Sequence, residues 1–210
     1  MPDLSHEIRL GHGPDFPVCG VDEAGRGPLA GPVVAAAVLL PAGPVADWCA
    51  GINDSKQVRQ ALRQTMFERI VANAPHGIGI ASVEEIDAVN ILQATFLAMT
   101  RAVDQLAAQM GRMPALALID GNRGPKLRCR VETLVDGDAL SLSIAAASIL
   151  AKVTRDKIMG QLALTHPGYG WETNQGYGTA THRAAILKLG VTPHHRRSFA
   201  PVSEQLSLTL

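Results

Sequence analysis

The chain has 210 residues, of which 47% are hydrophobic, and its 19 basic and 19 acidic side chains leave no net charge. This length and composition predict a single domain over residues 1–210 and exclude a membrane-spanning protein, because no apolar run is long enough to cross a bilayer. The first residues lack the pattern of a signal peptide, and the three cysteines lack metal-ligand spacing, so we expect a cytoplasmic protein.

Along the chain, short apolar runs alternate with longer helical patterns, which is typical of an α/β domain. Strands are expected at about 17–22, 32–40, 77–83, 115–120 and 129–135. Helices are expected at about 57–73, 82–110, 140–164 and 180–189. The run 33–40 has a composition that also suits a helix, but its flanking prolines and β-branched residues favour a strand. Residues 203–210 are expected to form a tail, which leaves a core of about 16–201.

Two of the expected helices carry further signals. The second begins with Ser82, and Glu85 follows three residues later, which is the pattern of a capping box. The apolar stripe of the first, which should face the core, consists of Leu62, Met66, Ile70 and Val71.

The first expected strand ends in two adjacent acidic residues, Asp22 and Glu23, and a glycine-flanked arginine follows. Adjacent carboxylates at a strand end repel each other and lose hydration, so a cation or basic group must offset that cost. In the following turn, Gly25 and Gly27 allow the backbone to approach a ligand closely, and Arg26 can contact an anion. An isolated acidic pair is usually solvated, so the interpretation depends on what the rest of the chain supplies.

Further acidic residues follow the later strands. Asp120 ends the apolar run 116–119, and Asp136 and Asp138 precede the long helical run 143–153. Carboxylates from separate strand ends, with water completing the shell, suit hard cations such as Mg²⁺ or Mn²⁺. Zinc is a poorer alternative, because the chain has neither an HExxH motif nor paired CxxC motifs.

The zero net charge conceals an uneven distribution. Residues 1–122 carry 8 Lys and Arg against 13 Asp and Glu, whereas residues 123–210 carry 11 against 6. The acidic half could therefore hold cations while the basic half contacts phosphates, although chance and solvated faces also produce such an asymmetry.

These residues belong to an ordered series of motifs through which the chain resembles ribonuclease HII, the type 2 ribonuclease H of bacteria. The matching segments are Gly20–Pro32, Asn53–Lys56, Glu85–Asp87, Asn90–Ala94, Ile119–Asn122, Gly137–Asp138, Ala146–Asp156, Gly176–Thr179, His182 and Arg196–Phe199. The ordered set is far more specific than any single motif. The resemblance implies a ribonuclease H-like α/β fold, with a mixed central sheet flanked by helices and a helical C-terminal region.

The resemblance also implies a reaction. The expected enzyme is a metal-dependent endonuclease that hydrolyses the RNA strand of RNA–DNA hybrids and nicks duplex DNA 5′ of single ribonucleotides, leaving 3′-hydroxyl and 5′-phosphate ends. Its expected roles are ribonucleotide removal in DNA repair and RNA primer degradation. The implied catalytic residues, which are also the implied ligands of Mn²⁺ or Mg²⁺, are Asp22, Glu23, Asp120 and Asp138. Two ions during catalysis would make a protein nucleophile unnecessary.

The implied recognition of the ribose rests on two glycine-rich segments. In the family, the backbone of the loop formed here by Gly25, Arg26 and Gly27 contacts the 2′-hydroxyl, which distinguishes RNA from DNA at one sugar. Tyr177, which lies between two glycines, would stack on the next sugar and favour a deoxynucleotide there. Tyr169 lies in a similar Gly-Tyr-Gly segment and is the competing candidate for this contact.

Other side chains are expected to contact phosphates. Lys56 resembles the family's phosphate-contacting lysine, with a solvated loop lysine as the alternative. Ser148 and Lys152 lie four residues apart on one expected helix face, so both could reach the same phosphate strand. Asp156 is as suitable a partner for Lys152 or Arg155 as it is a ligand, and we leave it out of the catalytic set.

The remaining expectations concern departures from the family and binding partners. Asp136 and Gln175 stand where the family usually has a lysine and a basic residue, which bears on substrate affinity and metal preference. The segment 194–197, with the sequence His-His-Arg-Arg, is expected to form a basic surface element that touches nucleic acid. We expect a monomer that binds hybrids and ribonucleotide-containing duplex DNA. The segment 203–208 only loosely resembles a sliding-clamp peptide, because it lacks the usual aromatic end.

Two other classes of function are weaker alternatives. A nucleic-acid-binding module that has lost cleavage would not need all four carboxylates. A phosphate-cradling NTPase would need a GxxxxGK[ST] motif after the first strand, and the chain has none.

Overall fold

The computed structural model describes residues 1–55 and 58–208, and it contains one five-stranded mixed sheet. All five expected strands are present. They are β1 (Val18–Ala24), β2 (Val33–Val38), β3 (His76–Ala81), β4 (Leu116–Asp120) and β5 (Arg130–Leu134). The spatial order is β3-β2-β1-β4-β5, in which β2 is antiparallel to both β1 and β3. Because β1, β4 and β5 are mutually parallel, their carboxyl ends meet at one edge of the sheet.

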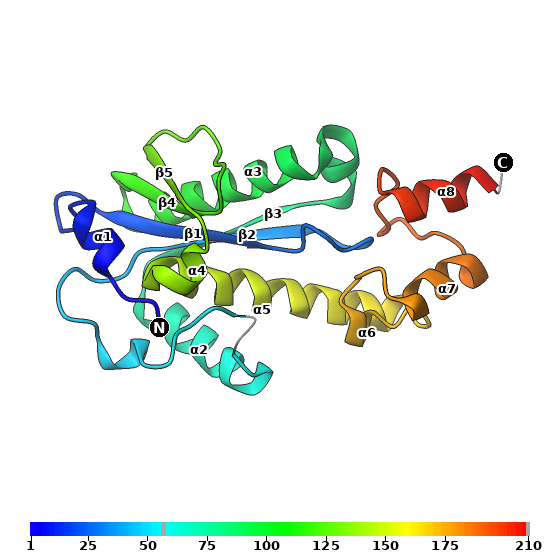
Figure 1. Cartoon of the computed structure of the whole chain (residues 1–210), viewed down its shortest axis with the longest axis horizontal. Coiled ribbons are helices and arrows are strands. Elements are labelled where there is room, and N and C mark those ends of the chain that lie inside the picture. The colour runs from blue at the N-terminus through cyan, green and yellow to red at the C-terminus, as the bar shows by residue number, and fades with distance from the viewer. Residues whose placement is uncertain (56–57, 209–210) are drawn as a thin grey trace.

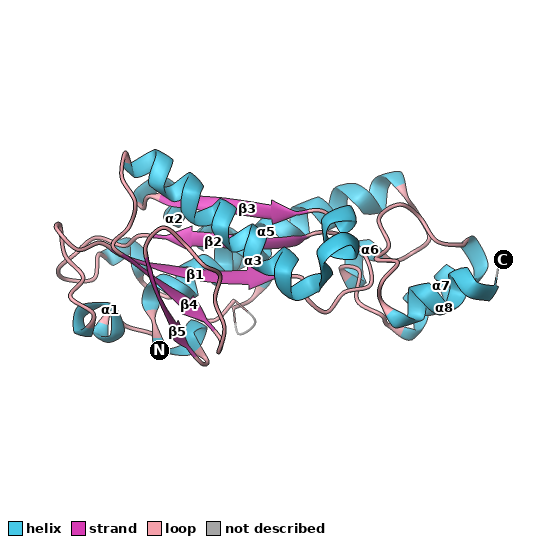
Figure 2. Ribbon diagram, turned by 90° about the horizontal axis from the view of Figure 1, so that it is seen from above, coloured by secondary structure: helices cyan, strands magenta, loops and turns pink. Residues whose placement is uncertain are grey.

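Helices cover both faces of the sheet. The helical segments are α1 (Ser5–Arg9), a 3₁₀ turn (Asp47–Cys49), α2 (Gln60–Asn73), α3 (Val83–Met110), α4 (Gly137–Leu140), α5 (Leu142–Thr165), α6 (Trp171–Asn174), α7 (Ala180–Leu189) and α8 (Ala200–Leu208). Figure 1 shows α3 on one face, with α5 and α2 on the other. In Figure 2, α7 and α8 extend beyond the end of the sheet as a separate C-terminal layer.

Small residues allow the helices to pack closely on the sheet. A Cβ atom built on Gly79 of β3 would lie 2.0 Å from the carbonyl oxygen of Ala98 in α3. A Cβ atom on Gly20 of β1 would lie 2.2 Å from the carbonyl carbon of Ser143 in α5. Only glycine fits at such contacts. The alanine-rich strand β2 is buried on both faces, which explains why its sequence lacks the alternation of a half-exposed strand.

The expected helix 82–110 has the predicted ends but is not continuous. The capping box is present, with Ser82 and Glu85 exchanging both hydrogen bonds. At Asn90 the backbone adopts a φ of 71°, and the Asn90 Oδ1 atom accepts hydrogen bonds from the N–H groups of Leu92 and Gln93. Asn90 therefore acts as an N-cap for a second helix inside α3, a role that asparagine favours and that the apolar periodicity does not reveal.

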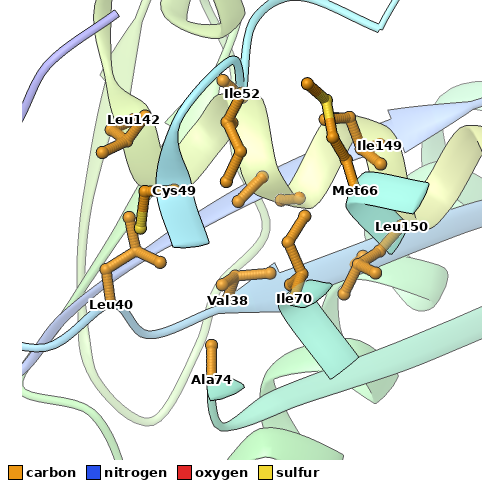
Figure 3. Packing of buried hydrophobic residues seen from close by; sticks show 14 of the residues in the cluster. Val38, Leu40, Cys49, Ile52, Met66, Ile70, Ala74, Leu142, Ile149 and Leu150 are labelled. Atoms are coloured by element: carbon orange, nitrogen blue, oxygen red, sulfur yellow. The ribbon is translucent and has the colours of Figure 1, made fainter. Parts of the chain in front are cut away.

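The expected apolar stripe of α2 is only half correct. Met66 and Ile70 are buried in the cluster between α2, α5 and β2, which Figure 3 shows around Val38. Leu62 and Val71 are 48% and 41% exposed. The prediction for these two residues is wrong because α2 lies outside α5 and buries a stripe narrower than the pattern suggested. The expected helix start near residue 57 lies outside the described residues, and the described helix begins at Gln60.

Packed segments also lie outside the expected core. Glu7 of α1 is 1% exposed, and its Oε1 atom accepts hydrogen bonds from the Ser141 hydroxyl at 2.6 Å and the Ser143 N–H at 3.0 Å. This carboxylate stabilises the amino end of α5, where unpaired N–H groups favour negative charge. The expected tail forms most of α8, next to the buried Val202. Within the described part of the chain, no helix is both long and apolar enough to cross a membrane.

Adjacent positions of α2 provide a test of this packing. Ile70→Ala should lower the free energy of unfolding by about 2–5 kcal/mol, because it leaves a cavity in a fully buried cluster. Val71→Ala, one residue later and 41% exposed, should change it by no more than about 0.5 kcal/mol. Denaturant unfolding of both variants measures the difference. Equal losses would contradict the orientation of α2.

Candidate active site

Three elements bring carboxylates to one edge of the sheet. Asp22 and Glu23 lie near the end of β1, and Asp120 ends the parallel strand β4. Because Val21 of β1 pairs with Ile119 of β4, the acidic residues that follow them, Asp22 and Asp120, lie side by side. Asp138 lies in the first turn of α4, whose Gly137 N–H donates a hydrogen bond of 2.7 Å to the Asp120 Oδ1 atom. The structure therefore brings together all four of the carboxylates predicted from the sequence.

A cavity of about 280 Å³ opens beside these carboxylates. Its lining comes from Asp22–Gly27, Ser55, Asp120, Lys152, Arg155 and Tyr177. Asp138 is buried and is not part of this lining. Most of the predicted catalytic and substrate-binding residues thus border a single space.

Asp22 and Glu23 reach this cavity although neighbouring side chains on a strand point to opposite faces. Asp22 is 5% exposed. Glu23 and Asp120 also line a smaller pocket of about 50 Å³ on the α3 side, together with residues of α3. Asp22 and Glu23 therefore lie at the edge of the sheet where spaces on its two faces meet, which is possible because β1 ends here.

The carboxylates influence one another electrostatically. Burial raises the pKa of Asp22 well above its usual value, and the negative charges of Glu23, Asp120 and Asp138 raise it further. A hydrogen bond of 2.7 Å from the Glu23 N–H to the Asp22 Oδ1 atom opposes this shift. Without a cation, the arrangement therefore favours the protonated form of Asp22.

These four carboxylates fit a hard divalent cation chemically. Carboxylate oxygens are the ligands that Mg²⁺ and Mn²⁺ prefer, and a bound cation would relieve the repulsion that raises the Asp22 pKa. Among the residues that the structure describes, no three His, Cys, Asp or Glu side chains are grouped closely enough to enclose an ion by themselves.

The glycine loop over residues 25–32 borders the cavity and has a tightly constrained backbone. Gly25 has a φ of 98°, which favours glycine, and a Cβ atom at this position would lie 2.0 Å from the Arg155 Nε atom. The loop is joined to the C-terminal layer by a hydrogen bond of 2.8 Å from the Leu29 N–H to the Gly176 carbonyl oxygen. Both constraints fix the position of the loop relative to the carboxylates.

The two candidate tyrosines have different environments. Tyr177 is 48% exposed and lines the cavity, and a Cβ atom built on Gly27 would lie 3.6 Å from its ring. Tyr169 is 5% exposed, its hydroxyl donates to the Gly190 carbonyl oxygen at 2.9 Å, and its ring stacks on Trp171. Of the two, Tyr177 is therefore the one placed to meet a ligand in the cavity.

The candidate phosphate contacts differ in accessibility. Lys152 lines the cavity, and its Nζ atom lies 2.6 Å from Asp156, so Lys152 is the partner among the alternatives that the sequence left open for Asp156. Ser148 is 3% exposed; its hydroxyl donates to Ala145 and accepts from the Ser55 N–H at 3.3 Å. Ser148 thus holds the loop at Ser55 and does not line the cavity. Lys56 lies outside the described residues.

The expected basic surface element at 194–197 is largely wrong. His195 and Arg196 are completely buried, whereas Arg197 is exposed. Burial and, to a smaller extent, the neighbouring His182 lower the pKa of His195 to about 4, so His195 is neutral at physiological pH. Arg196 is buried because its guanidinium group binds carbonyl oxygens of the glycine loop.

Sequence reasoning thus missed two buried arginines that pack against the glycine loop. Arg155 was considered only as a possible partner of Asp156, and Arg196 was assigned to the surface. Their burial depends on contacts with the glycine loop, which is distant in sequence. Gly31, for example, accepts a hydrogen bond from Arg196 and lies 165 residues before it. No local pattern distinguishes Arg196 from the exposed Arg197 beside it.

Comparison with known proteins agrees with this geometry. The family model of ribonuclease HII matches residues 19–202. The chain is 56% identical over 207 residues to ribonuclease HII of Paramagnetospirillum magneticum, a match that covers 98% of this chain and 99% of that protein. It is 57% identical over 210 residues to ribonuclease HII of Rhodospirillum rubrum, covering 99% and 93% of the two chains.

Solved structures of low sequence identity share the fold. The crystal structure of Bst-RNase HIII in complex with Mn²⁺ aligns with a TM-score of 0.75 at 21% identity, covering 92% of this chain and 70% of that one. RNase HII in the PCNA complex from Archaeoglobus fulgidus aligns with a TM-score of 0.68 at 22% identity, covering 88% and 95%. The expected ribonuclease H-like fold is therefore confirmed.

The raised pKa of Asp22 predicts how stability changes with pH in metal-free buffer. The folded state holds the Asp22 proton more tightly than the unfolded chain does. The wild-type protein should therefore lose stability as pH rises from the unfolded-state value of about 3.9 through the raised folded-state value. Because asparagine does not titrate, Asp22→Asn should melt at a higher temperature than wild type at about pH 7.

Thermal unfolding in the presence of a chelator measures this difference. The difference in melting temperature between Asp22→Asn and wild type should shrink toward about pH 3, where Asp22 is protonated in both the folded and the unfolded state. The exposed Asp47 is the control, since Asp47→Asn should change the melting temperature little at either pH. A lower melting temperature of Asp22→Asn at neutral pH would contradict the repulsion described above.

Proposed function

Because the chain belongs to the ribonuclease HII family, and is therefore a ribonuclease H that acts on RNA–DNA hybrids, we propose that it is a metal-dependent endonuclease. It also nicks duplex DNA 5′ of single embedded ribonucleotides, leaving 3′-hydroxyl and 5′-phosphate ends. The observation that carries this proposal is the single cavity bordered by the carboxylates, the glycine loop and Tyr177. The role that follows is ribonucleotide removal in DNA repair and degradation of RNA primers.

The carboxylates form the candidate metal-binding group. Asp22, Glu23, Asp120 and Asp138 would hold Mn²⁺ or Mg²⁺, and two such ions supply an activated water and stabilisation of the leaving oxygen. The Mn²⁺ in the structure of Bst-RNase HIII supports a divalent ion in this fold. In the protein itself, burial and rigid strand ends hold the oxygens in place, so little reorganisation is required when a phosphate binds.

Two cationic side chains at the cavity suit the substrate's phosphates. Lys152 lines the cavity from α5, and its pairing with Asp156 fixes the direction of its side chain. The Arg26 Nη1 atom lies 3.2 Å from Glu23, and its side chain is 52% exposed. Both can therefore contact a nucleic-acid backbone without a change in the fold.

The glycine loop and Tyr177 would divide the recognition of the substrate. The backbone of Gly25–Gly27 would contact the 2′-hydroxyl, which is the group that distinguishes a ribonucleotide from a deoxynucleotide. The Tyr177 ring lies beside Gly27 and is half exposed, so it would meet the sugar of the adjacent nucleotide. This adjacency supports cutting at the junction between a ribonucleotide and DNA.

A duplex DNA with one internal ribonucleotide tests the proposed activity directly. Incubation with the protein and Mn²⁺ should give one nick on the 5′ side of the ribonucleotide, and an all-DNA duplex of the same sequence should stay intact. Asp22→Asn and Asp120→Asn should each abolish the nick, because each removes a ligand charge with almost no change in side-chain volume. Circular dichroism should show that both variants remain folded. Turnover near the wild-type rate by either variant would contradict the carboxylate assignment.

Tyr177 provides a separate test of junction recognition. Loss of a stacking contact costs about 1–3 kcal/mol, so Tyr177→Ala should reduce turnover at a single ribonucleotide by about 5- to 150-fold. Binding to an all-DNA duplex should change much less. The control is Tyr169→Phe, which removes only the hydrogen bond to Gly190 and should leave turnover close to wild type. If Tyr177→Ala keeps wild-type turnover at the single ribonucleotide, the assignment of the junction contact to Tyr177 is wrong.

A further inference from the structure

Two buried cations lie behind the glycine loop. Arg155 of α5 is 1% exposed and Arg196 is 0% exposed. Within the described residues, neither guanidinium group forms an ion pair with a carboxylate, and both are hydrogen-bonded to backbone carbonyl oxygens. Burial lowers the pKa of Arg155 to about 10 and that of Arg196 to about 9, so both are still cations at neutral pH. Burying an unpaired cation costs several kcal/mol before hydrogen bonds offset it, roughly as for other buried ions.

Arg196 determines which way the loop's peptide groups face. Its Nη2 atom donates to the Gly25 carbonyl oxygen at 2.6 Å, and its Nη1 atom donates to that of Arg26 at 2.9 Å. Its Nε atom donates to the Gly31 carbonyl oxygen at 3.0 Å. One planar guanidinium group therefore holds both ends of the loop.

The geometry of the peptide bond gives this contact a consequence on the other side. In a trans peptide, the N–H group of the next residue points opposite to the carbonyl group, and the described chain has no cis peptides. With the Gly25 and Arg26 carbonyl groups turned to Arg196, the next two N–H groups point away from it. Since Gly25–Gly27 line the cavity, these N–H groups face the cavity.

Arg155 joins the same loop to the segment that carries Tyr177. Its Nε and Nη2 atoms donate to the carbonyl oxygens of Pro32 and Ala30, at 3.0 and 3.1 Å. Its Nη1 atom donates to the Gln175 carbonyl oxygen at 3.0 Å, two residues before the tyrosine. Arg155 thereby sets the spacing between the two elements proposed to recognise adjacent nucleotides.

We propose that Arg155 and Arg196 are positioning residues for ribonucleotide recognition. Arg196 directs the loop's N–H groups toward the 2′-hydroxyl, and Arg155 fixes Tyr177 at the distance of one nucleotide from that hydroxyl. Neither side chain needs to act on the reacting phosphate. This inference rests on the proposed cutting at single ribonucleotides.

The test replaces each arginine by lysine, which keeps the positive charge but lacks the planar set of donors. Arg196→Lys should reduce kcat by about 10- to 100-fold on both a single-ribonucleotide duplex and a continuous RNA–DNA hybrid, because a displacement near 1 Å has that effect. Arg155→Lys should reduce kcat on the single-ribonucleotide duplex more than on the hybrid, because only the former requires the junction contact. The Kd for an all-DNA duplex should stay within about twofold of wild type in both, since the charge is kept.

Two controls separate positioning from general stability. Arg128→Lys makes the same change at an exposed arginine that pairs with Asp104, and it should leave kcat and Kd unchanged. Ile70→Ala removes a buried side chain of the cluster between α2, α5 and β2, to which no residue of the glycine loop belongs. It should lower the melting temperature yet retain kcat when assayed well below that temperature.

The outcomes are distinguishable. If the wild-type protein makes no nick at a ribonucleotide, the proposed function is wrong and the inference fails with it. If wild type cuts and both lysine variants keep wild-type kcat, only the inference is wrong. It is also wrong if kcat and all-DNA binding decline in parallel, as they would in a partly unfolded protein. If Arg196→Lys does not fold, Arg155→Lys decides the question through its ratio of rates on the two substrates.

Discussion

The parallel pairing of β1 with β4 is the constraint on which the rest of the molecule depends. It places the acidic ends of two strands side by side, with Val21 opposite Ile119 and the carboxylates just beyond. Burial raises the pKa of Asp22, and the like charges placed beside it raise this pKa further. Such a strand edge is stable only because the sheet is held on both faces by closely packed helices, which glycine and alanine residues of β1, β2 and β3 admit.

The sequence predicts the strands and the acidic edge well because both are local properties. A short apolar run between turn residues predicts a strand in most folds, and the five expected runs correspond to five strands. Two of these strands, β1 and β4, carry carboxylates at or near their ends. The resemblance to ribonuclease HII then implied that these strands form a mixed central sheet flanked by helices. The structure of residues 1–12 was harder to foresee, since Glu7 is ordered by contacts with Ser141 and Ser143, more than a hundred residues away.

Local sequence fails where the fate of a polar side chain depends on a distant partner. Arg196 and Arg197 are chemically identical neighbours, yet one is buried and the other is exposed. The difference arises because the glycine loop presents several carbonyl oxygens with no strand or helix to satisfy them, and a buried carbonyl oxygen requires a donor. The predicted burial of Leu62 and Val71 is wrong for a related reason. The sequence shows that both residues are apolar, but it does not show how wide a surface α5 provides for packing against α2.

The carboxylates and the buried arginines both lie close to the glycine loop. The Gly25 and Arg26 peptide groups have their negative carbonyl ends at the Arg196 guanidinium group, and the proposed orientation turns their positive N–H ends toward the acidic cavity. Both ends are therefore in a favourable field, and the arginines and carboxylates stabilise one orientation of the loop together. A protein that kept the carboxylates and replaced the arginines by apolar residues would lose this orientation. Hydrogen bonds to the loop's carbonyl oxygens offset the cost of burying Arg155 and Arg196, and the proposed role in sugar recognition gives a reason for keeping two cations there.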